Sequence, residues 1–132
     1  MTDYDREIDY RLLNNLSTDG VWDWHIIEDW EYMSPRYWEM LGYTPDEKKH
    51  HPSEWMGIIK PEDKEMFMSE YQRQLDLGGE IDICMPVEYK HKDGHTVYVI
   101  CRGRVVEWDS DHNPKRMIGT HTDVTEYIKK AQ

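Results

Sequence analysis

The sequence predicts a single α+β domain in which helices pack on one face of an antiparallel sheet. Three observations lead to this prediction. The chain has 132 residues, a length typical of one domain. Its patterns follow the order helix, two strands, several helices, three strands and helix. Strands and helices that are grouped in this way, instead of alternating, are typical of α+β folds.

The first 19 residues predict an amphipathic helix, because apolar residues recur at every fourth position with charged residues between them. These apolar residues are Tyr4, Ile8, Leu12 and Leu16. The stripe needs a surface to cover, which is either the sheet of this domain or a second copy of the chain. Two strands follow, at 21–27 and 30–33, and alternation places Trp22 and Trp24 on one face of the first.

The helical segments of the middle region carry start and stop signals. Ser34 caps a helix whose first position is Pro35, and Gly42 ends it. Short helical turns begin near Thr44 and Ser53. A longer helix begins at Pro61 and ends at the pair 78–79, two glycines.

The hairpin around Lys92-Asp93-Gly94 reveals which side chains share the inner face of the sheet. A two-residue loop would place Val87 opposite Ile100. A three-residue loop with Gly94 in the left-handed conformation instead pairs apolar with apolar residues along the whole ladder. Its pairs are Val87 with Val99, Met85 with Cys101 and Tyr89 with Val97. We therefore predict the three-residue loop.

Two consequences of this register can be checked. Cys84 and Cys101 point to opposite faces of the sheet, so they cannot form a disulfide without backbone movement. Pro86 has no N–H to donate to a strand ladder, so its strand is expected at a sheet edge.

Composition and charge exclude several classes of function. The 27 acidic and 16 basic residues give a net charge of −11, which repels nucleic acid and anionic membrane surfaces. No apolar run reaches the ~18 residues of a membrane span, and the N-terminus lacks the apolar stretch of a signal peptide. Two cysteines make no disulfide framework, which fits a reducing cytoplasm.

Six sequence motifs in order, between Gly20 and Glu126, resemble the Per-Arnt-Sim (PAS) sensor family with its C-terminal PAC half. The early motifs are Gly20-Val21-Trp22-Asp23-Trp24, Met33-Ser34-Pro35 with Met40-Leu41-Gly42-Tyr43, and Ile59-Lys60-Pro61-Glu62-Asp63. The later ones are Glu88-Tyr89-Lys90-His91-Lys92-Asp93-Gly94, Arg102-Gly103-Arg104-Val105-Val106 and Ile118-Gly119-Thr120-His121-Thr122-Asp123-Val124-Thr125.

The resemblance implies a five-stranded antiparallel sheet with helices on one face and flanking N- and C-terminal helices. It divides the chain into an N-terminal helix at 1–19, a PAS/PAC domain at 20–126 and the start of a C-terminal signalling helix or linker at 127–132. A ligand, where present, would lie between helices and sheet. The implied pocket residues are Trp22, Trp24, Tyr89, Val97, Val99, Cys101 and His121.

The resemblance also bears on cofactors. Flavin photosensors of the family use a cysteine in a Gly-x-Asn-Cys-Arg-Phe-Leu-Gln helix, whereas both cysteines here lie on predicted strands, so we expect no flavin adduct. Haem-binding members use a histidine on the helix that begins here at Pro61, and 61–77 contains none, so haem is not expected. His50 and His51 are adjacent and have no further ligands spaced to bind zinc, and we expect no metal there.

Two features of the pocket remain open, and an enzymatic role ranks last. Trp22 and Trp24 either stack on a flat ligand or fill the space, and we favour filling because a small core needs bulky residues. His121 is expected either to be a hydrogen-bonded core residue or to bind a polar ligand group and titrate near neutrality. An enzyme using His121 as a base lacks any second catalytic group, and no Gly-x-Ser-x-Gly, P-loop or Cys-x-x-Cys is present.

The favoured hypothesis is a non-catalytic sensory and interaction module in a bacterial signalling protein, followed by a histidine kinase or diguanylate cyclase as output domain. We expect Asp123 to pair with Arg102 or Arg104 and, with Thr125, to join the sheet to the exit helix. A homodimer is expected through the N-terminal helix and the outer face of the sheet. The dimer-face residues are Ile8, Leu12, Leu16, Tyr98, Ile100, Val106 and Trp108. The alternative is a small-molecule or haem carrier domain whose occupancy is the signal.

Overall fold

A computed structural model describes residues 18–131. Within them five strands form one antiparallel sheet in the order β2-β1-β5-β4-β3. The strands are β1 (Gly20–His25), β2 (Trp30–Met33), β3 (Ile83–Lys90), β4 (Thr96–Trp108) and β5 (Pro114–Asp123). The predicted α+β fold is confirmed, while the helix expected at 1–19 lies almost wholly outside the described residues.

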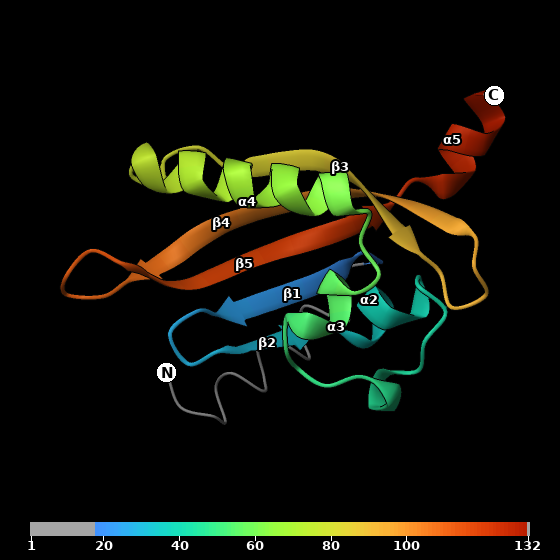
Figure 1. Ribbon diagram of the computed structural model, residues 1–132, viewed down its shortest axis with the longest axis horizontal. Coiled ribbons are helices and arrows are strands. Elements are labelled where there is room, and N and C mark those ends of the chain that lie inside the picture. The colour runs from blue at the N-terminus through green and yellow to red at the C-terminus, as the bar shows by residue number, and fades with distance from the viewer. Residues whose placement is uncertain (1–17, 132) are drawn as a thin grey trace.

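Helices cover one face of this sheet (Figure 1). They are α2 (Pro35–Glu39), the 3-10 turn η1 (Pro45–Glu47), α3 (Ser53–Met56) and α4 (Pro61–Asp76). The long α4 lies along β3 and β4, whereas α2 and α3 lie near β1 and β2. The last helix, α5 (Thr125–Ala131), projects away from the body of the domain.

The helix boundaries follow from the capping signals in the sequence. The Ser34 hydroxyl accepts a hydrogen bond from the Tyr37 N–H at the start of α2, and Pro35 occupies the first helical position. At the end of α4, Gly78 and Gly79 have φ of 74° and 80°. Their N–H groups donate to the carbonyls of Leu75 and Gln74, a Schellman arrangement that satisfies two terminal acceptors.

The register of the central hairpin agrees with the three-residue loop. β3 and β4 pair Val87 with Val99, Met85 with Cys101 and Tyr89 with Val97. The Gly94 φ is 101°, the left-handed region that this loop requires. Cys84 is exposed on one face and Cys101 is buried on the other, and both are free thiols.

The edge position predicted for the strand with Pro86 is also confirmed, since β3 is the last strand of the sheet. The free edge is partly covered. The Glu88 N–H donates to the Asp63 carboxylate at 2.8 Å, and the Lys90 N–H donates to the Ile58 carbonyl at 2.8 Å. These contacts protect part of the edge against pairing with another chain, and Pro86 has no N–H to offer there.

One prediction about the outer face of the sheet is wrong. Strict alternation places Trp108 on that face, but the register of β4 against β5 shifts between Val105 and Trp108. After this bulge, Glu107 is hydrogen-bonded to Arg116, and the Trp108 ring instead packs against Gly79 at the end of α4. A bulge inserts a residue into one strand and so reverses the faces of those that follow.

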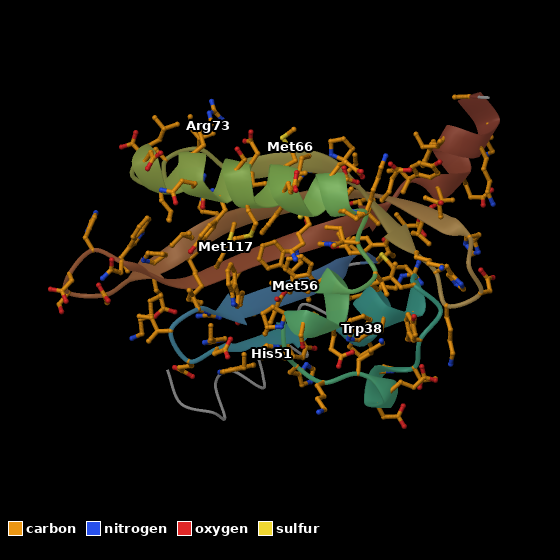
Figure 2. All side chains as sticks on the ribbon, in the orientation of Figure 1. Trp38, His51, Met56, Met66, Arg73 and Met117 are labelled. Atoms are coloured by element: carbon orange, nitrogen blue, oxygen red, sulfur yellow. The ribbon has the colours of Figure 1, made fainter. Side chains whose placement is uncertain are left out.

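A buried polar side chain joins α4 to the sheet. The Gln74 amide donates to the Ile81 carbonyl at 2.7 Å and accepts from the Val105 N–H at 3.0 Å. Met117 is fully buried on the sheet below the helices, whereas Met66 and Arg73 point away from α4 into solvent (Figure 2). Gln74 therefore fixes the inner side of α4 where β4 has its bulge.

We expect Gln74→Met to lower the free energy of unfolding by about 2–4 kcal/mol, because it leaves the buried Val105 N–H and Gly103 carbonyl without this partner and removes the bond to the Ile81 carbonyl. Urea denaturation measures the difference. Gln72→Met is the matched control, since Gln72 lies on the exposed side of the same helix and bonds only Asp76 among the described residues. Equal losses in the two variants would contradict the role assigned to Gln74.

Candidate functional site

The centre of the domain is built around the Trp22 indole, which lies against two glycines. Gly103 of β4 and Gly119 of β5 are directly paired. A Cβ atom at Gly103 would lie 2.6 Å from the Trp22 ring, and a Cβ at Gly119 would overlap both that ring and the Arg102 carbonyl. Only glycines leave enough room at this pair for the ring to contact the backbone of two strands.

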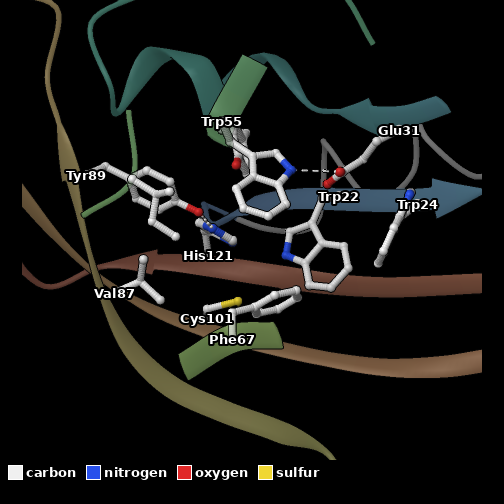
Figure 3. A pocket seen from close by; sticks show the side chains of 11 residues that line it. Trp22, Trp24, Glu31, Trp55, Phe67, Val87, Tyr89, Cys101 and His121 are labelled. Carbon is white, nitrogen blue, oxygen red and sulfur yellow. Dashed lines mark hydrogen bonds between the residues drawn. The ribbon is translucent and has the colours of Figure 1, made fainter. Parts of the chain in front are cut away.

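A small cavity lies beside Trp22, between the helices and the sheet (Figure 3). Water-molecule centres have about 20 Å³ of space in it, which is room for about one water. Five of the seven predicted pocket residues line it, namely Trp22, Trp24, Tyr89, Cys101 and His121. Val97 and Val99 are buried on the same face of the sheet but are not part of the cavity wall.

His121 is held in an aromatic cluster. Its Nε2 shares a 2.8 Å hydrogen bond with the Tyr89 hydroxyl, and its ring packs against Tyr37 and, edge-on, against Trp22. Burial lowers the pKa of His121 to about 3. Of the two alternatives, the structure agrees with the hydrogen-bonded core residue, and it contradicts titration near neutrality, because the imidazole is neutral throughout the physiological range.

Glu31 provides the carboxyl group of the cavity wall. Its carboxylate accepts a 2.8 Å hydrogen bond from the Trp55 indole N–H, drawn as a dashed line in Figure 3. Burial raises the pKa of Glu31 to about 8, although the bond from Trp55 opposes the shift. Near pH 7 the carboxyl is thus mostly protonated and neutral.

The cavity residues do not fit the two coloured cofactors of the family. Burial raises the pKa of the Cys101 thiol to about 12, so it is a poor nucleophile for a flavin adduct, and Cys84 lies on the opposite face. For haem, α4 offers no histidine, and the Nε2 of His121 is engaged by Tyr89. The space beside Trp22 would have to grow many-fold to admit either ring system.

Several wall residues were missed by the sequence analysis. They are Glu31, Tyr37, Trp55, Ile59, Phe67 and Val87. For two of these residues, the sequence pattern could have predicted a position facing the cavity. Glu31 is two residues before the apolar Met33 in β2, so alternation places both on the inner face, and Val87 pairs with Val99 in the predicted register. The other four depend on how the helices pack over the sheet, which local patterns do not show.

A second cluster of hydrogen bonds joins the sheet to α5. The Thr125 hydroxyl donates to the Asp123 carboxylate at 2.6 Å and accepts from the Tyr98 N–H at 3.0 Å. The Thr125 N–H donates to the same carboxylate, and the Val124 N–H donates to the Tyr98 carbonyl at 2.8 Å. The first turn of α5 is therefore bonded to the backbone of β4.

The expected ion pair between Asp123 and Arg102 or Arg104 is wrong. Asp123 lies opposite Val99 in the ladder, whereas Arg102 and Arg104 lie opposite positions three and five residues earlier on β5. At ~3.3 Å per residue these positions are about 10 Å and 17 Å away along the strand. Arg104 pairs instead with Asp82, and Arg102 bonds the Thr122 hydroxyl.

The outer face of the sheet carries the remaining predicted dimer residues. Tyr98 and Ile100 are half-buried there, and Val106 is 40% exposed. Ile8, Leu12 and Leu16 lie outside the described residues, so the dimer face as a whole stays a prediction. No helix among residues 18–131 is both long enough and apolar enough to cross a membrane.

The chain belongs to the PAS family. The family model described as "PAS fold" matches residues 31–121, more than half of the chain. PAS domains are sensory and generally non-catalytic. A search of curated protein sequences gives no match.

Solved structures support the fold. A sensory box histidine kinase/response regulator from Burkholderia thailandensis is 23% identical with a TM-score of 0.74, covering 92% of this chain and 88% of that one. The N-terminal domain of a diguanylate cyclase with PAS/PAC sensor from Marinobacter aquaeolei is 22% identical with a TM-score of 0.68, covering 83% and 98%. The Rhodobacter sphaeroides LOV protein is 11% identical with a TM-score of 0.67, covering 93% and 69%.

Truncation of Trp22 is expected to create a large cavity in the centre of the domain. Trp22→Ala should lower the free energy of unfolding by about 3–5 kcal/mol, because a buried indole is removed and the glycine pair below it cannot close the gap. Added indole should then raise the melting temperature of the variant and leave that of the wild type unchanged. Trp24→Ala is the control, since Trp24 is only partly buried. A Trp22→Ala protein as stable as the wild type would contradict this role.

The buried Glu31 predicts a specific pH dependence of stability. Because its pKa is about 8 in the folded state against 4.5 for the free side chain, its favourable contribution is complete below pH 4.5 and is lost as the pH rises through 8. Glu31→Gln keeps an acceptor for Trp55 and removes the ionisation. The variant should therefore gain roughly 3–5 kcal/mol over the wild type between about pH 5 and about pH 9.

Chemical denaturation at both pH values measures this gain. Glu65→Gln is the matched control, since Glu65 lies exposed on α4. Parallel pH profiles for the wild type and Glu31→Gln would show that Glu31 ionises normally in the folded protein.

Proposed function

We propose that this PAS domain is a sensory and interaction module that regulates an output domain attached after α5. The observation that carries the proposal is the cluster of hydrogen bonds among Tyr98, Asp123 and Thr125, which fixes the start of α5 to β4. Any shift of β4 against β5 is passed to the direction of α5 through these short bonds. The projection of α5 away from the domain supports a role as the exit to a further segment (Figure 1).

The cavity supplies a place where such a shift can start. His121 on β5 is paired with Cys101 on β4, and both side chains line the cavity. Packing in this interior is tight, so a change in the positions of Trp22 or Tyr89 cannot be absorbed locally. The two strands that would respond are the same two that hold the start of α5.

The names of the structural relatives support a proposal for the kind of output domain. The similar domains belong to proteins named as a histidine kinase and a diguanylate cyclase. We infer that the parent protein is a signalling enzyme of one of these two kinds, acting in the bacterial cytoplasm as a homodimer. The net charge of −11 speaks against nucleic acid and anionic membrane as partners of this segment.

A second candidate is a domain whose occupancy by a small ligand is itself the signal. It rests on the polar groups at the cavity, since the Trp22 indole N–H has no hydrogen-bond acceptor among residues 18–131 and Glu31 is mostly neutral near pH 7. With room for about one water, the cavity would first accept a ligand of a few atoms. Mass spectrometry of molecules that co-purify with the protein tests this candidate, and its failure leaves the role of α5 untouched.

Removal of the Thr125 hydroxyl tests the proposed route to the output domain. Thr125→Val keeps the shape of the side chain and loses the bonds to Tyr98 and Asp123. In the full-length protein we expect at least a fivefold smaller response of the output activity to its stimulus, because α5 is no longer tied to β4. The loss of stability should be modest, about 1–3 kcal/mol.

Two further variants complete the experiment. Asp123→Ala, which removes the other partner of Thr125, should reduce the response in the same way. Thr120→Val is the control, because Thr120 lies on β5 outside the junction. An unchanged response in both Thr125→Val and Asp123→Ala would rule out the junction as the signal route.

A further inference from the structure

We propose that the β3–β4 hairpin binds a divalent transition-metal ion of the zinc type through His91, Asp93 and His95. The three residues occupy alternate positions across the three-residue loop. Each offers one ligand atom, and these atoms all lie within 4.8 Å of one another. None of the three residues lines the central cavity.

The donor atoms already converge on one carboxylate. The Asp93 Oδ1 atom lies 3.1 Å from the His91 Nδ1 atom and is also in contact with the His95 Nδ1 atom. Two ligands of a tetrahedral ion, each bonded at ~2.0–2.1 Å, lie about 3.3 Å apart. The two imidazole rings are stacked with their centroids 4.2 Å apart. Binding therefore requires His95 Nδ1 to move away from Asp93 Oδ1 and the two rings to turn out of their stacked arrangement. It also requires His91 Nδ1 to give up the hydrogen bond that it accepts from the Asp93 N–H.

The backbone that carries these side chains is held in place. The His91 N–H donates to the His95 carbonyl at 2.8 Å, and the Gly94 N–H donates to the His91 carbonyl at 2.9 Å. The hairpin is also anchored to the end of α2, where the Lys92 N–H donates to the Leu41 carbonyl and the His91 ring packs against Gly42. An ion would therefore order few additional groups, which favours its binding.

The donor set selects the class of metal. Two imidazoles and one carboxylate suit zinc and its neighbours in the transition series, whereas calcium and magnesium prefer six or more oxygen ligands. Three protein ligands leave a fourth position for water. The net charge of −11 favours the approach of cations. His95 also lines a surface groove with Asp123 and Glu126, so the ion would lie near the base of α5.

Calorimetric titration of the whole chain with Zn²⁺ alone tests the proposal. We expect one ion per chain, and addition of Zn²⁺ should shift the ring NMR signals of His91 and His95. Asp93→Asn keeps an acceptor for the His95 N–H and removes the charged ligand, while His95→Gln removes one imidazole. Each variant should bind Zn²⁺ at least tenfold more weakly, and an excess of Mg²⁺ should not compete.

His112→Asn is the matched control. His112 lies in the β4–β5 turn close to Asp109, and its φ of 66° is tolerated by asparagine. The control should bind Zn²⁺ as the wild type does, and circular dichroism shows whether the variants are folded. The absence of one-site binding, or an affinity unchanged in folded Asp93→Asn and His95→Gln, would overturn the proposal. It is measured without any output domain, so its failure does not bear on the proposed signalling role.

Discussion

The contact between the Trp22 indole and the Gly103–Gly119 pair is the constraint on which the rest of the interior depends. A large ring can lie directly on two adjacent strands only where both lack side chains. Once seated there, Trp22 meets Phe67 of α4 edge-on and borders the cavity with His121. One side chain from β1 therefore joins the middle of the sheet to the helix above it. The small size of the cavity follows from this packing, because the space of a flat ligand is taken by the indole.

Neutral polar groups accompany the aromatic rings in this interior. Glu31 and His121 have pKa values displaced in opposite directions, and burial is the main cause in both. Each group is thus kept uncharged near pH 7, and each has a hydrogen-bond partner, Trp55 or Tyr89. Charged forms would carry a large desolvation cost here. The interior is consequently well suited to respond to packing or to an uncharged polar molecule, and poorly suited to proton transfer near neutrality.

The sequence was informative wherever a local rule has one physical solution. The pairing of Val87 with Val99 followed from apolar matching across the hairpin, and the edge position of β3 followed from the missing N–H of Pro86. The sequence was misleading where the regular alternation of a strand is interrupted. The bulge in β4 has no strong sequence signal, so Trp108 was assigned to the wrong face. Long-range contacts such as Trp55 with Glu31, 24 residues apart, depend on helix placement that periodicity does not encode.

The predicted ion pair of Asp123 with Arg102 or Arg104 does not form. The connection between the sheet and α5 consists instead of hydrogen bonds to the backbone of β4. A pair between Asp123 and an arginine would be a flexible contact worth ~0–1 kcal/mol when exposed. The structure instead ties Thr125 to the Tyr98 N–H, and Val124 to the Tyr98 carbonyl, so α5 is bonded to the main chain of β4. Asp123 follows the cavity residue His121 by two positions, which is about 7 Å along an extended strand. Over so short a length a strand is stiff, so the proposed signal route needs only one strand between the cavity wall and α5. This proximity of the cavity and α5 along β5 is the physical reason for proposing that they act together.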